Sequence, residues 1–319
     1  MTTPAGTSAV TPAVVAARLE PSPPRRRGPA GSRNQRTIAW LMMLPAAVLI
    51  ITFLIVPIGL TFVLAFTDAK LISPRPAQFI GVDNFVRLFE NGTFWASLRN
   101  TIIFTIVIVP FQSGLALGLA LLVNTKMRGT NFFRTIYFLP LVTSIVVVSM
   151  LWLFMYQPNG LINSILARFG IQGPDWLGNP ATALLAIILM SAWQAMGLHM
   201  VVWLAGLQTI PADLYEAADL DGASKWQQFA NVTWPGLRQT RTFILITITI
   251  AAFGLFTQVN LMTQGGPLNA TTTLVYQAVQ TGFRQQQTGY ASAISLVFFV
   301  LVLIVTLIQR YLTRDKEVR

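Results

Sequence analysis

The sequence has no cysteine, one histidine and little charge, and each shortage excludes a class of protein. Its 319 residues are 54% hydrophobic and only 10% charged, whereas globular domains carry about 25% charged residues. The absence of cysteine excludes a disulfide framework, a Cys-based zinc site and a thiol nucleophile. With His199 as the one histidine, an imidazole-rich metal site is excluded as well. The apolar excess instead indicates a lipid bilayer as the surrounding solvent.

Long stretches without Asp, Glu, Lys or Arg indicate six membrane-spanning helices. A spanning helix needs roughly 20 apolar residues, and six windows of the sequence reach that length. Trimmed by hydropathy, the expected spans are 38–66, 101–123, 136–156, 181–207, 243–262 and 290–308. The sequence therefore predicts an all-α membrane protein, with one six-span domain over residues 37–319.

Lys and Arg are unevenly divided between the two sides that these spans define. Sixteen of the 22 lie in the N-terminal segment, the second and fourth connections and the C-terminal segment, and six lie on the other side. Cytoplasmic loops carry the excess of Lys and Arg, so we expect both termini in the cytoplasm. This orientation accounts for the net charge of +11 without a nucleic-acid partner.

Residues 1–36 differ in composition from the rest of the chain. They are rich in Pro, Ala, Ser and Arg and contain no aromatic residue, so they cannot bury enough surface to fold alone. We expect a disordered cytoplasmic tail. An alternative role for Arg25, Arg26 and Arg27 is contact with anionic headgroups of the membrane lipid.

None of the expected spans contains Asp, Glu, Lys or Arg. Transporters driven by an ion gradient place such residues inside the membrane as coupling sites. The chain also lacks the G-x-x-x-x-G-K-[ST] phosphate-binding loop, so it cannot hydrolyse ATP by that route. A six-span transport protein of this composition must take its energy from another subunit, and we expect no catalytic site, cofactor or metal in this chain.

The connection over residues 208–241 holds the densest motif. Pro211 suits the first turn of a helix, where its missing N–H is not needed. Gly222 fits a left-handed C-terminal cap, and Ser224 fits the N-cap of a second short helix ending before Pro235. The segment is acidic, and the sequence predicts a short helix–turn–helix outside the membrane. The segment is either a solvated loop or a structure that binds in the cleft of a partner protein.

This loop resembles the signature of binding-protein-dependent ABC permeases, which is Glu-Ala-Ala, three residues, Gly, nine residues, an aliphatic residue, one residue and Leu-Pro. The chain has Glu216-Ala217-Ala218, Gly222, Val232 and Trp234-Pro235, so Val replaces the usual Ile and Trp the usual Leu. Further motifs resemble the carbohydrate-uptake branch, the maltose and glycerol-phosphate permease type. They are Phe79-Ile80-Gly81, Asn84-Phe85, Phe94-Trp95, Asn100-Thr101, Arg134 with Leu139-Pro140, Asn159-Gly160-Leu161-Ile162-Asn163, Trp193, Gly206-Leu207-Gln208, Gly265-Gly266-Pro267 and Gly289-Tyr290-Ala291.

The resemblance implies a type I ABC importer permease of the bacterial cytoplasmic (inner) membrane. Such a chain forms a heterodimer with a second homologous permease. Two copies of a cytoplasmic ATPase, which bind the ATP and Mg, and an extracytoplasmic solute-binding protein complete the assembly. ATP-driven closure of the ATPase pair moves a coupling helix and rocks the spans between inward-open and outward-open states. Carried over, the coupling role falls to Glu216, Ala217, Ala218, Asp221 and Gly222.

The resemblance also places the substrate path on the spans either side of this loop, over residues 191–199 and 248–255. The candidate contacts there are Ser191, Trp193, Gln194, His199 and Phe253. Packing through interhelical hydrogen bonds and aromatic contacts is an alternative role for all of them.

The function expected from the resemblance is import of a sugar or sugar-like solute. A permease for glycerol phosphate or glycerophosphodiesters is an alternative, but such anions should meet basic groups that the spans lack. A polytopic membrane enzyme is a more remote alternative, because it would need acidic residues at a membrane face.

The charge asymmetry generates a topology prediction. A reporter enzyme that is active only in the cytoplasm, fused after Arg319, is expected to be active, and a reporter that requires export is expected to be silent. The reverse pattern would contradict the assignment of both termini to the cytoplasm.

Overall fold

The computed structural model describes residues 32–124 and 130–313, which belong to two units. The first unit ends at Ile55 and contains α1 (Ser32–Ile50) and the π turn η2 (Ile51–Ile55); the second begins at Val56. Side chains from Thr37 to Ile55 are exposed, although nearly all are hydrophobic, which suits a helix whose whole surface meets lipid or other apolar helices.

Because α1 begins at Ser32, residues 32–36 are helical, whereas we expected them to belong to a disordered tail. Once a helix is nucleated, adding residues to its end costs little. Residues 1–31 of the expected tail lie outside the described residues.

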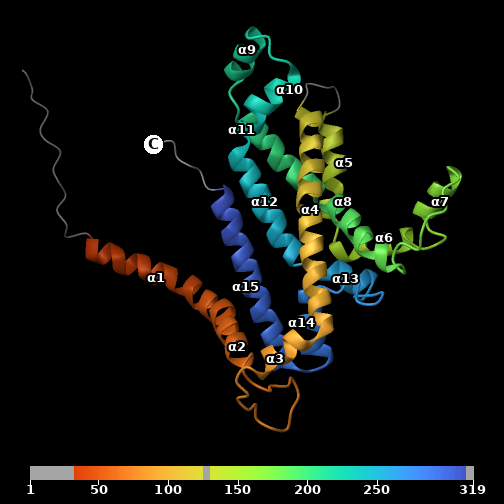
Figure 1. Ribbon diagram of the computed structural model, residues 1–319. Helices are drawn as coiled ribbons and strands as arrows, with labels where there is room; N and C mark the ends of the chain where they lie inside the picture. Colours follow the sequence, from red (N-terminus) through yellow and green to blue (C-terminus); the bar gives the residue numbers. More distant parts are fainter. Residues whose placement is uncertain (1–31, 125–129, 314–319) are drawn as a thin grey trace, which may run out of the picture. The chain divides into compact units, whose positions relative to one another are not determined.

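The second unit is a set of helices of very unequal length (Figure 1). In chain order they are α2 (Val56–Leu64), α3 (Asp83–Glu90), α4 (Gly92–Asn124), α5 (Thr130–Val142), α6 (Ile145–Met155), α7 (Leu161–Arg168), α8 (Pro180–Gln208), α9 (Ala212–Leu220), α10 (Lys225–Gln228), the π turn η3 (Phe229–Thr233), α11 (Trp234–Gly236), α12 (Arg238–Phe253), α13 (Thr257–Met262), α14 (Leu274–Val279), the π turn η4 (Gln280–Arg284) and α15 (Thr288–Thr313).

Within the described ranges, five helical segments are long and apolar enough to cross a membrane, and a bent pair makes a sixth when it is counted as one span. The five are Thr37–Leu64, Gly92–Asn124, Pro180–Gln208, Arg238–Met262 and Thr288–Tyr311. They confirm five of the predicted spans. The largest difference is at α4, which begins nine residues before the predicted edge because the side-chain oxygen of Asn91 accepts a hydrogen bond from the Thr93 N–H and caps the helix.

The third predicted span, 136–156, is not one helix. Its arms, Thr135–Val142 and Ile145–Met155, meet at 104°. Pro140 lacks an N–H for the helical ladder, the Thr143 hydroxyl donates to the Leu139 carbonyl at 3.3 Å, and Ser144 has an extended ψ of 134°. A proline, a threonine hydroxyl that bonds the backbone and an extended residue at Ser144 together break the span.

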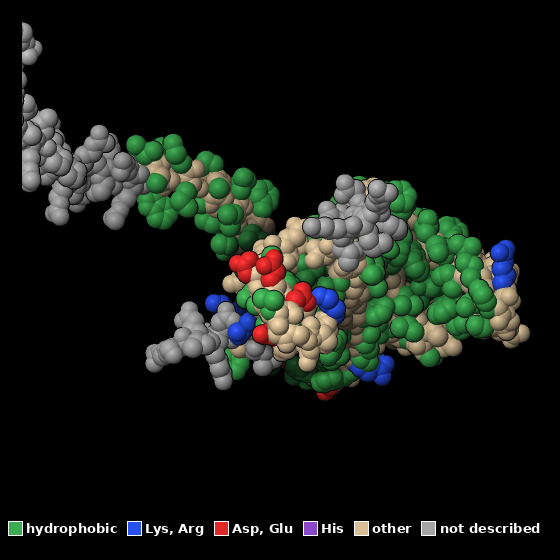
Figure 2. Space-filling view, turned by 90° about the horizontal axis from the view of Figure 1, so that it is seen from above, with side chains coloured by type: hydrophobic (Ala, Val, Ile, Leu, Met, Phe, Trp, Pro, Cys, Tyr) green, Lys and Arg blue, Asp and Glu red, His purple; other side chains and the backbone are tan. Residues whose placement is uncertain are grey.

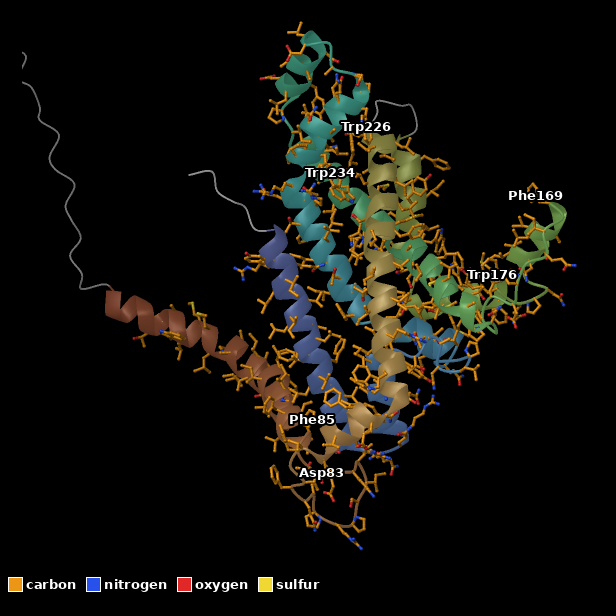
Figure 3. All side chains as sticks on the ribbon, viewed as in Figure 1. Asp83, Phe85, Phe169, Trp176, Trp226 and Trp234 are labelled. Atoms are coloured by element: carbon orange, nitrogen blue, oxygen red, sulfur yellow. The ribbon has the colours of Figure 1, made fainter. Side chains whose placement is uncertain are left out.

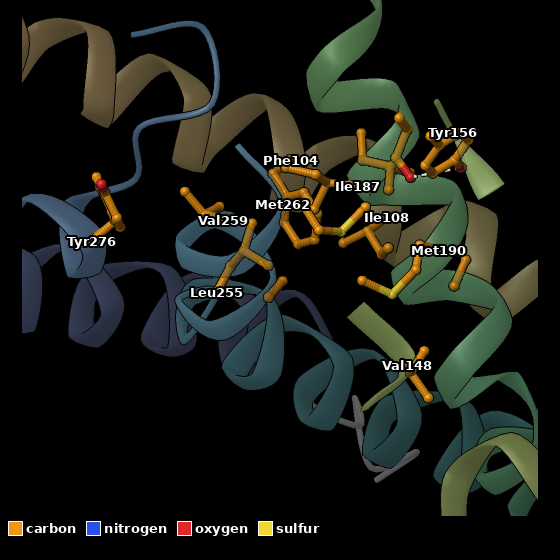
Figure 4. Packing of buried hydrophobic residues seen from close by; sticks show 14 residues of the cluster. Phe104, Ile108, Val148, Tyr156, Ile187, Met190, Leu255, Val259, Met262 and Tyr276 are labelled. Carbon is orange, nitrogen blue, oxygen red and sulfur yellow. Dashed lines mark hydrogen bonds between the residues drawn. The ribbon is translucent and has the colours of Figure 1, made fainter. Parts of the chain in front are cut away.

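Three long helices form the centre of the second unit: α4 packs against α8 and α12, and α5 covers another side of α8 (Figure 1). One apolar cluster joins them to α6 and α13, and Figure 4 shows its packing. The Tyr156 hydroxyl in this cluster donates to the Ala186 carbonyl at 3.0 Å. A second cluster, which includes Trp203, Leu237 and Ile244, lies nearer the α9 end.

At the opposite end, buried amides and hydroxyls join the connections to the helices. The Asn84 amide donates to the carbonyls of Ala65 and Thr67 at 2.9 and 2.8 Å. The Asn100 amide donates to the carbonyls of Asn269 and Thr272 at 2.7 and 3.0 Å. The Asn84 bonds fix the segment after α2 against α3, and the Asn100 bonds fix the loop between α13 and α14 against α4.

Glycine permits the close approach of α8 to α5. A Cβ at Gly197 would overlap the Tyr137 carbonyl, whereas a Cβ at Gly118 in α4 would meet no atom of this chain within 4 Å. Substitution of alanine for each of the two glycines therefore adds the same methyl group, in a crowded position at Gly197 and in an open one at Gly118.

We expect Gly197→Ala to separate α5 from α8 and lower the thermal unfolding temperature of the protein in detergent, at a cost of about 1–3 kcal/mol. Gly118→Ala is expected to leave the unfolding temperature unchanged or to raise it slightly, because alanine favours a helix interior. Equal unfolding temperatures for the two variants would show that the close contact at Gly197 is unimportant.

Candidate functional site

A cavity of about 240 Å³ lies between α4, α8 and α12. Its walls are Phe104, Ile108, Gln112, Ser191, Gln194, Ala195, Leu198, His199, Thr247, Ile248, Ala251, Ala252, Leu255 and Gln258. Among these residues there is no Asp, Glu, Lys or Arg. The cavity thus offers amides, hydroxyls and one imidazole on an otherwise apolar wall, which suits an uncharged ligand rich in hydroxyl groups.

Gln112 and His199 form a pair across the cavity wall. The Gln112 Nε2 lies 2.9 Å from His199 Nδ1, which is also 3.0 Å from the Ala195 carbonyl oxygen. A protonated Nδ1 donates to Ala195, whereas a bare Nδ1 accepts from the Gln112 amide. The two tautomers therefore present different hydrogen-bonding groups at Nε2, and the contacts of Nδ1 with Gln112 and with Ala195 favour opposite tautomers.

Ser191 adds a hydroxyl with no protein partner. Its Oγ is buried and makes no hydrogen bond within the described part of the chain, and the residue is only 8% exposed. A buried hydroxyl without a partner costs free energy. A ligand hydroxyl or a water at this wall of the cavity would remove that cost.

The sequence-predicted contacts divide into two groups. Ser191, Gln194 and His199 line the cavity. Trp193 instead packs against Trp152, with ring centres 5.5 Å apart, and Phe253 is buried 6.2 Å from Phe298 in a T-shaped pair. Neither aromatic residue is in the cavity wall, and each packs against another aromatic ring.

Sequence reasoning missed Gln112, Thr247 and Gln258, which also line the cavity. Gln112 was detectable, because an amide in the middle of an apolar span needs a partner on another helix. Thr247 gave no such signal: its hydroxyl donates to the carbonyls of Phe243 and Ile244 at 3.0 Å, within its own helix.

The acidic connection forms the predicted helix–turn–helix at the far end of the unit from α3 (Figure 1). Gly222 has φ +72°, and two hydrogen bonds close the helix end: Ala223 N–H to the Ala218 carbonyl and Gly222 N–H to the Asp219 carbonyl. This Schellman arrangement confirms the left-handed cap. Ser224 caps α10 through a capping box with Gln227, as expected.

The second helix of this loop runs past Pro235 rather than ending before it. The wider π turn η3 comes directly before α11 (Trp234–Gly236), in which Pro235 occupies a first-turn position. A first-turn proline needs no hydrogen-bonded N–H, so the helical path continues through it.

Polar contacts fasten α9 to the helix that follows. Asp219 accepts hydrogen bonds from the Gln228 amide and the Lys225 ammonium, and Tyr215 and Thr233 share one through their hydroxyls at 2.9 Å. The Gln228 and Lys225 contacts lower the pKa of Asp219 below its ordinary value. The contacts of Asp219 therefore weaken as the pH falls through that lowered pKa.

The residues assigned to coupling lie on the outer surface of this loop. Glu216, Ala217, Asp221 and Gly222 are exposed, and Ala218 is half-buried. Figure 2 looks onto this end and shows acidic side chains around hydrophobic ones. The exposed hydrophobic residues of α9 include Leu220, which is 89% exposed. A surface on which acidic groups surround exposed leucines suits binding to a partner protein with a basic cleft.

Membrane-length helices around an uncharged polar cavity are the arrangement of a polytopic membrane transport protein. Comparison with known proteins makes the class specific. Residues 112–318 match the family described as binding-protein-dependent transport system inner membrane component, and the chain belongs to that family.

Curated relatives resemble almost the whole chain. The lactose transport system permease protein LacF of Rhizobium radiobacter is 37% identical over 284 residues, which cover 87% of this chain and 94% of the relative. The sulfoquinovosyl glycerol transport system permease protein SmoG of Agrobacterium fabrum is 36% identical over 286 residues, covering 89% and 92%.

The fold is also that of a solved permease. A bacterial ABC transporter involved in the import of the acidic polysaccharide alginate contains a chain with a TM-score of 0.77 and 26% identity, covering 89% of this chain and 97% of that one. The type I permease fold predicted from the sequence is confirmed.

Proposed function

We propose that this chain is the membrane-spanning permease subunit of an ATP-driven importer of an uncharged sugar. It works by alternating access in the inner membrane of a bacterium, with both termini in the cytoplasm. Its partners are a second homologous permease, two copies of an ATPase that binds ATP and Mg, and an extracytoplasmic solute-binding protein. Family membership supports the permease role, and the names of the relatives support a carbohydrate substrate.

The absence of charged residues from the cavity wall is the observation that supports an uncharged sugar as the substrate. The carbohydrates that these names describe differ in charge, because lactose is uncharged whereas sulfoquinovosyl glycerol and alginate are acidic, so membership alone does not define the charge of the substrate. Within the cavity wall, Gln112, Ser191 and Gln194 offer hydrogen bonds without charge, and His199 adds an imidazole. A phosphate group would meet no cation there, which disfavours glycerol phosphate and glycerophosphodiesters.

The α9 loop is proposed to occupy the ATPase cleft. Glu216 lies in the exposed acidic surface, and the Gly222 cap sets the direction in which the chain leaves α9. Closure of the ATPase pair would then move α9 as a unit, because Asp219 and Tyr215 fasten it to the following helix. The permease itself supplies no group for ATP hydrolysis.

Substitutions in this loop test the proposal. We expect Glu216→Ala and Gly222→Val to lower the amount of ATPase that copurifies with the permease complex, and the ATP hydrolysis that the binding protein stimulates. An arginine of the partner that loses its carboxylate is left unpaired, at about 2 kcal/mol or more. A β-branched residue at φ +72° is strained.

Two matched variants control for loss of folding. Glu90→Ala makes the same change at the opposite end of the molecule, and Gly222→Asn keeps a residue that tolerates the left-handed conformation. Both should retain the ATPase. If Glu216→Ala and Gly222→Val also retain it fully, the loop is a solvated connection and the coupling proposal fails.

The cavity generates a prediction of its own. Gln194→Ala is expected to weaken uptake by roughly 5- to 150-fold in apparent affinity, which corresponds to about 1–3 kcal/mol for a sugar hydroxyl left without its partner. Uptake of radiolabelled lactose and maltose by reconstituted complex is the measurement. Gln157→Ala, at an exposed position outside the cavity, is the control, and equal uptake by both variants would remove Gln194 from the substrate path.

A further inference from the structure

A continuous series of ring contacts runs from the end of the α9 loop to the start of α12. The Trp226 and Phe229 rings stack with centres 5.6 Å apart and planes at 25°. Phe229 lies 6.1 Å from Trp234. The guanidinium carbon of Arg241 lies 4.4 Å from the centre of the Trp234 ring. Figure 3 shows where Trp226 and Trp234 lie on these short helices.

Trp234 occupies the middle of this series and joins two parts of the chain. On one side, Phe229 follows Gln228, which is 5% exposed and holds Asp219 of α9. On the other side, Arg241 belongs to the first turn of α12. Trp234 is 41% exposed, so its ring is a bridge at the surface rather than a core residue.

The Arg241 contact is a strong one for its position. One guanidinium nitrogen of Arg241, Nη1, is buried and makes no hydrogen bond to the described residues. A cation that has lost water on one side interacts more strongly with an aromatic face than a solvated one does. Leucine, the usual residue of the signature at position 234, offers no such face.

Helix α12 connects the Arg241–Trp234 contact with the cavity wall. Arg241 and Ile248 are seven residues apart, and so lie on one face of the helix two turns from each other. Ile248 and Ala251 line the cavity. Ile244, which lies between Arg241 and Ile248 in the sequence, is fully buried in the cluster that contains Leu237 and Trp203. A tilt of the first turn of α12 therefore cannot be absorbed by a loose segment before it reaches the cavity wall.

We propose that Trp234 is a positioning residue that transmits movement of α9 to α12, through its ring contacts with Phe229 and Arg241, and so couples ATP binding to the accessibility of the cavity. The inference rests on the proposed function, because it assumes that an ATPase moves α9. Trp226 stacks on the same Phe229 but is 74% exposed, and among the described residues no ring or cation–π contact joins it to α12. It lies outside the path and serves as a matched control.

The absence of cysteine makes a direct test possible. Ala251→Cys places one thiol in the cavity wall, and its rate of reaction with a maleimide is measured in the reconstituted complex, with and without MgATP and vanadate. ATP is expected to change this rate in the Ala251→Cys background. Adding Trp234→Leu is expected to reduce the ATP-dependent change about 3- to 10-fold, with the ATPase still copurifying fully.

Three further variants distinguish transmission from folding. Trp226→Leu is expected to leave the ATP response at its original size, and Trp234→Phe to restore most of it. Arg241→Gln should reduce the response as Trp234→Leu does, and the double variant should be no worse than either single one, because both interrupt the same path. Loss of the ATPase in Trp234→Leu, or additive effects in the double variant, would overturn the assignment and indicate a general structural role.

The remaining outcomes separate this inference from the function beneath it. If ATP changes the labelling of the Ala251→Cys protein and Trp234→Leu leaves that change intact, the ring series does not transmit the movement, although the permease proposal stands. If the ATPase does not bind the unsubstituted complex, or ATP never changes the labelling, the proposed coupling fails and this inference fails with it.

Discussion

Hydrocarbon offers no hydrogen-bond partner to a peptide group, and this constraint determines the backbone of the protein. The long apolar segments are helices wherever the structure describes them. Where a span is interrupted, polar side chains take the place of the helical ladder. At the break between α12 and α13, the buried Thr273 hydroxyl donates to the Leu255 carbonyl at 2.8 Å. At the break after α5, Thr143 donates to the Leu139 carbonyl.

The same constraint limits the polar groups that the cavity can hold. An ionised side chain there would have to be paired within the protein, and the pair would then be unavailable to a solute. Amides and hydroxyls cost less, and they can satisfy one another until a ligand arrives. Gln112 and His199 do so at 2.9 Å. A sugar hydroxyl that enters replaces one hydrogen bond with another, so binding and release both remain possible.

The features predictable from the sequence are those set by neighbouring residues. Five spans followed from length and hydropathy, and the conformation of Gly222 and the cap at Ser224 followed from the preferences of helix ends. The pairing of Gln112 with His199 depends on which helices meet in space. The bend after Pro140 has local causes that hydropathy alone does not register. The coupling and substrate roles of the candidate residues stay predictions, and Trp193 and Phe253 show that an aromatic residue in a span does not reveal which side it faces.

The motifs that carried the sugar-permease resemblance act mainly as internal ties. Asn84 and Asn100 bind backbone carbonyls of distant segments, and a Cβ at Gly289 would overlap the Thr67 carbonyl. These positions hold the end of the molecule opposite α9 together, and they say little about which sugar is carried. Under the proposed function, selectivity would depend on the residues that line the cavity, on α4, α8 and α12. Helix α12 begins beside the α9 loop and reaches the cavity within three turns, so under the proposed function one helix would meet both the source of movement and the solute. A rigid α12 is consequently the simplest means by which a loop outside the membrane can alter a binding site within it.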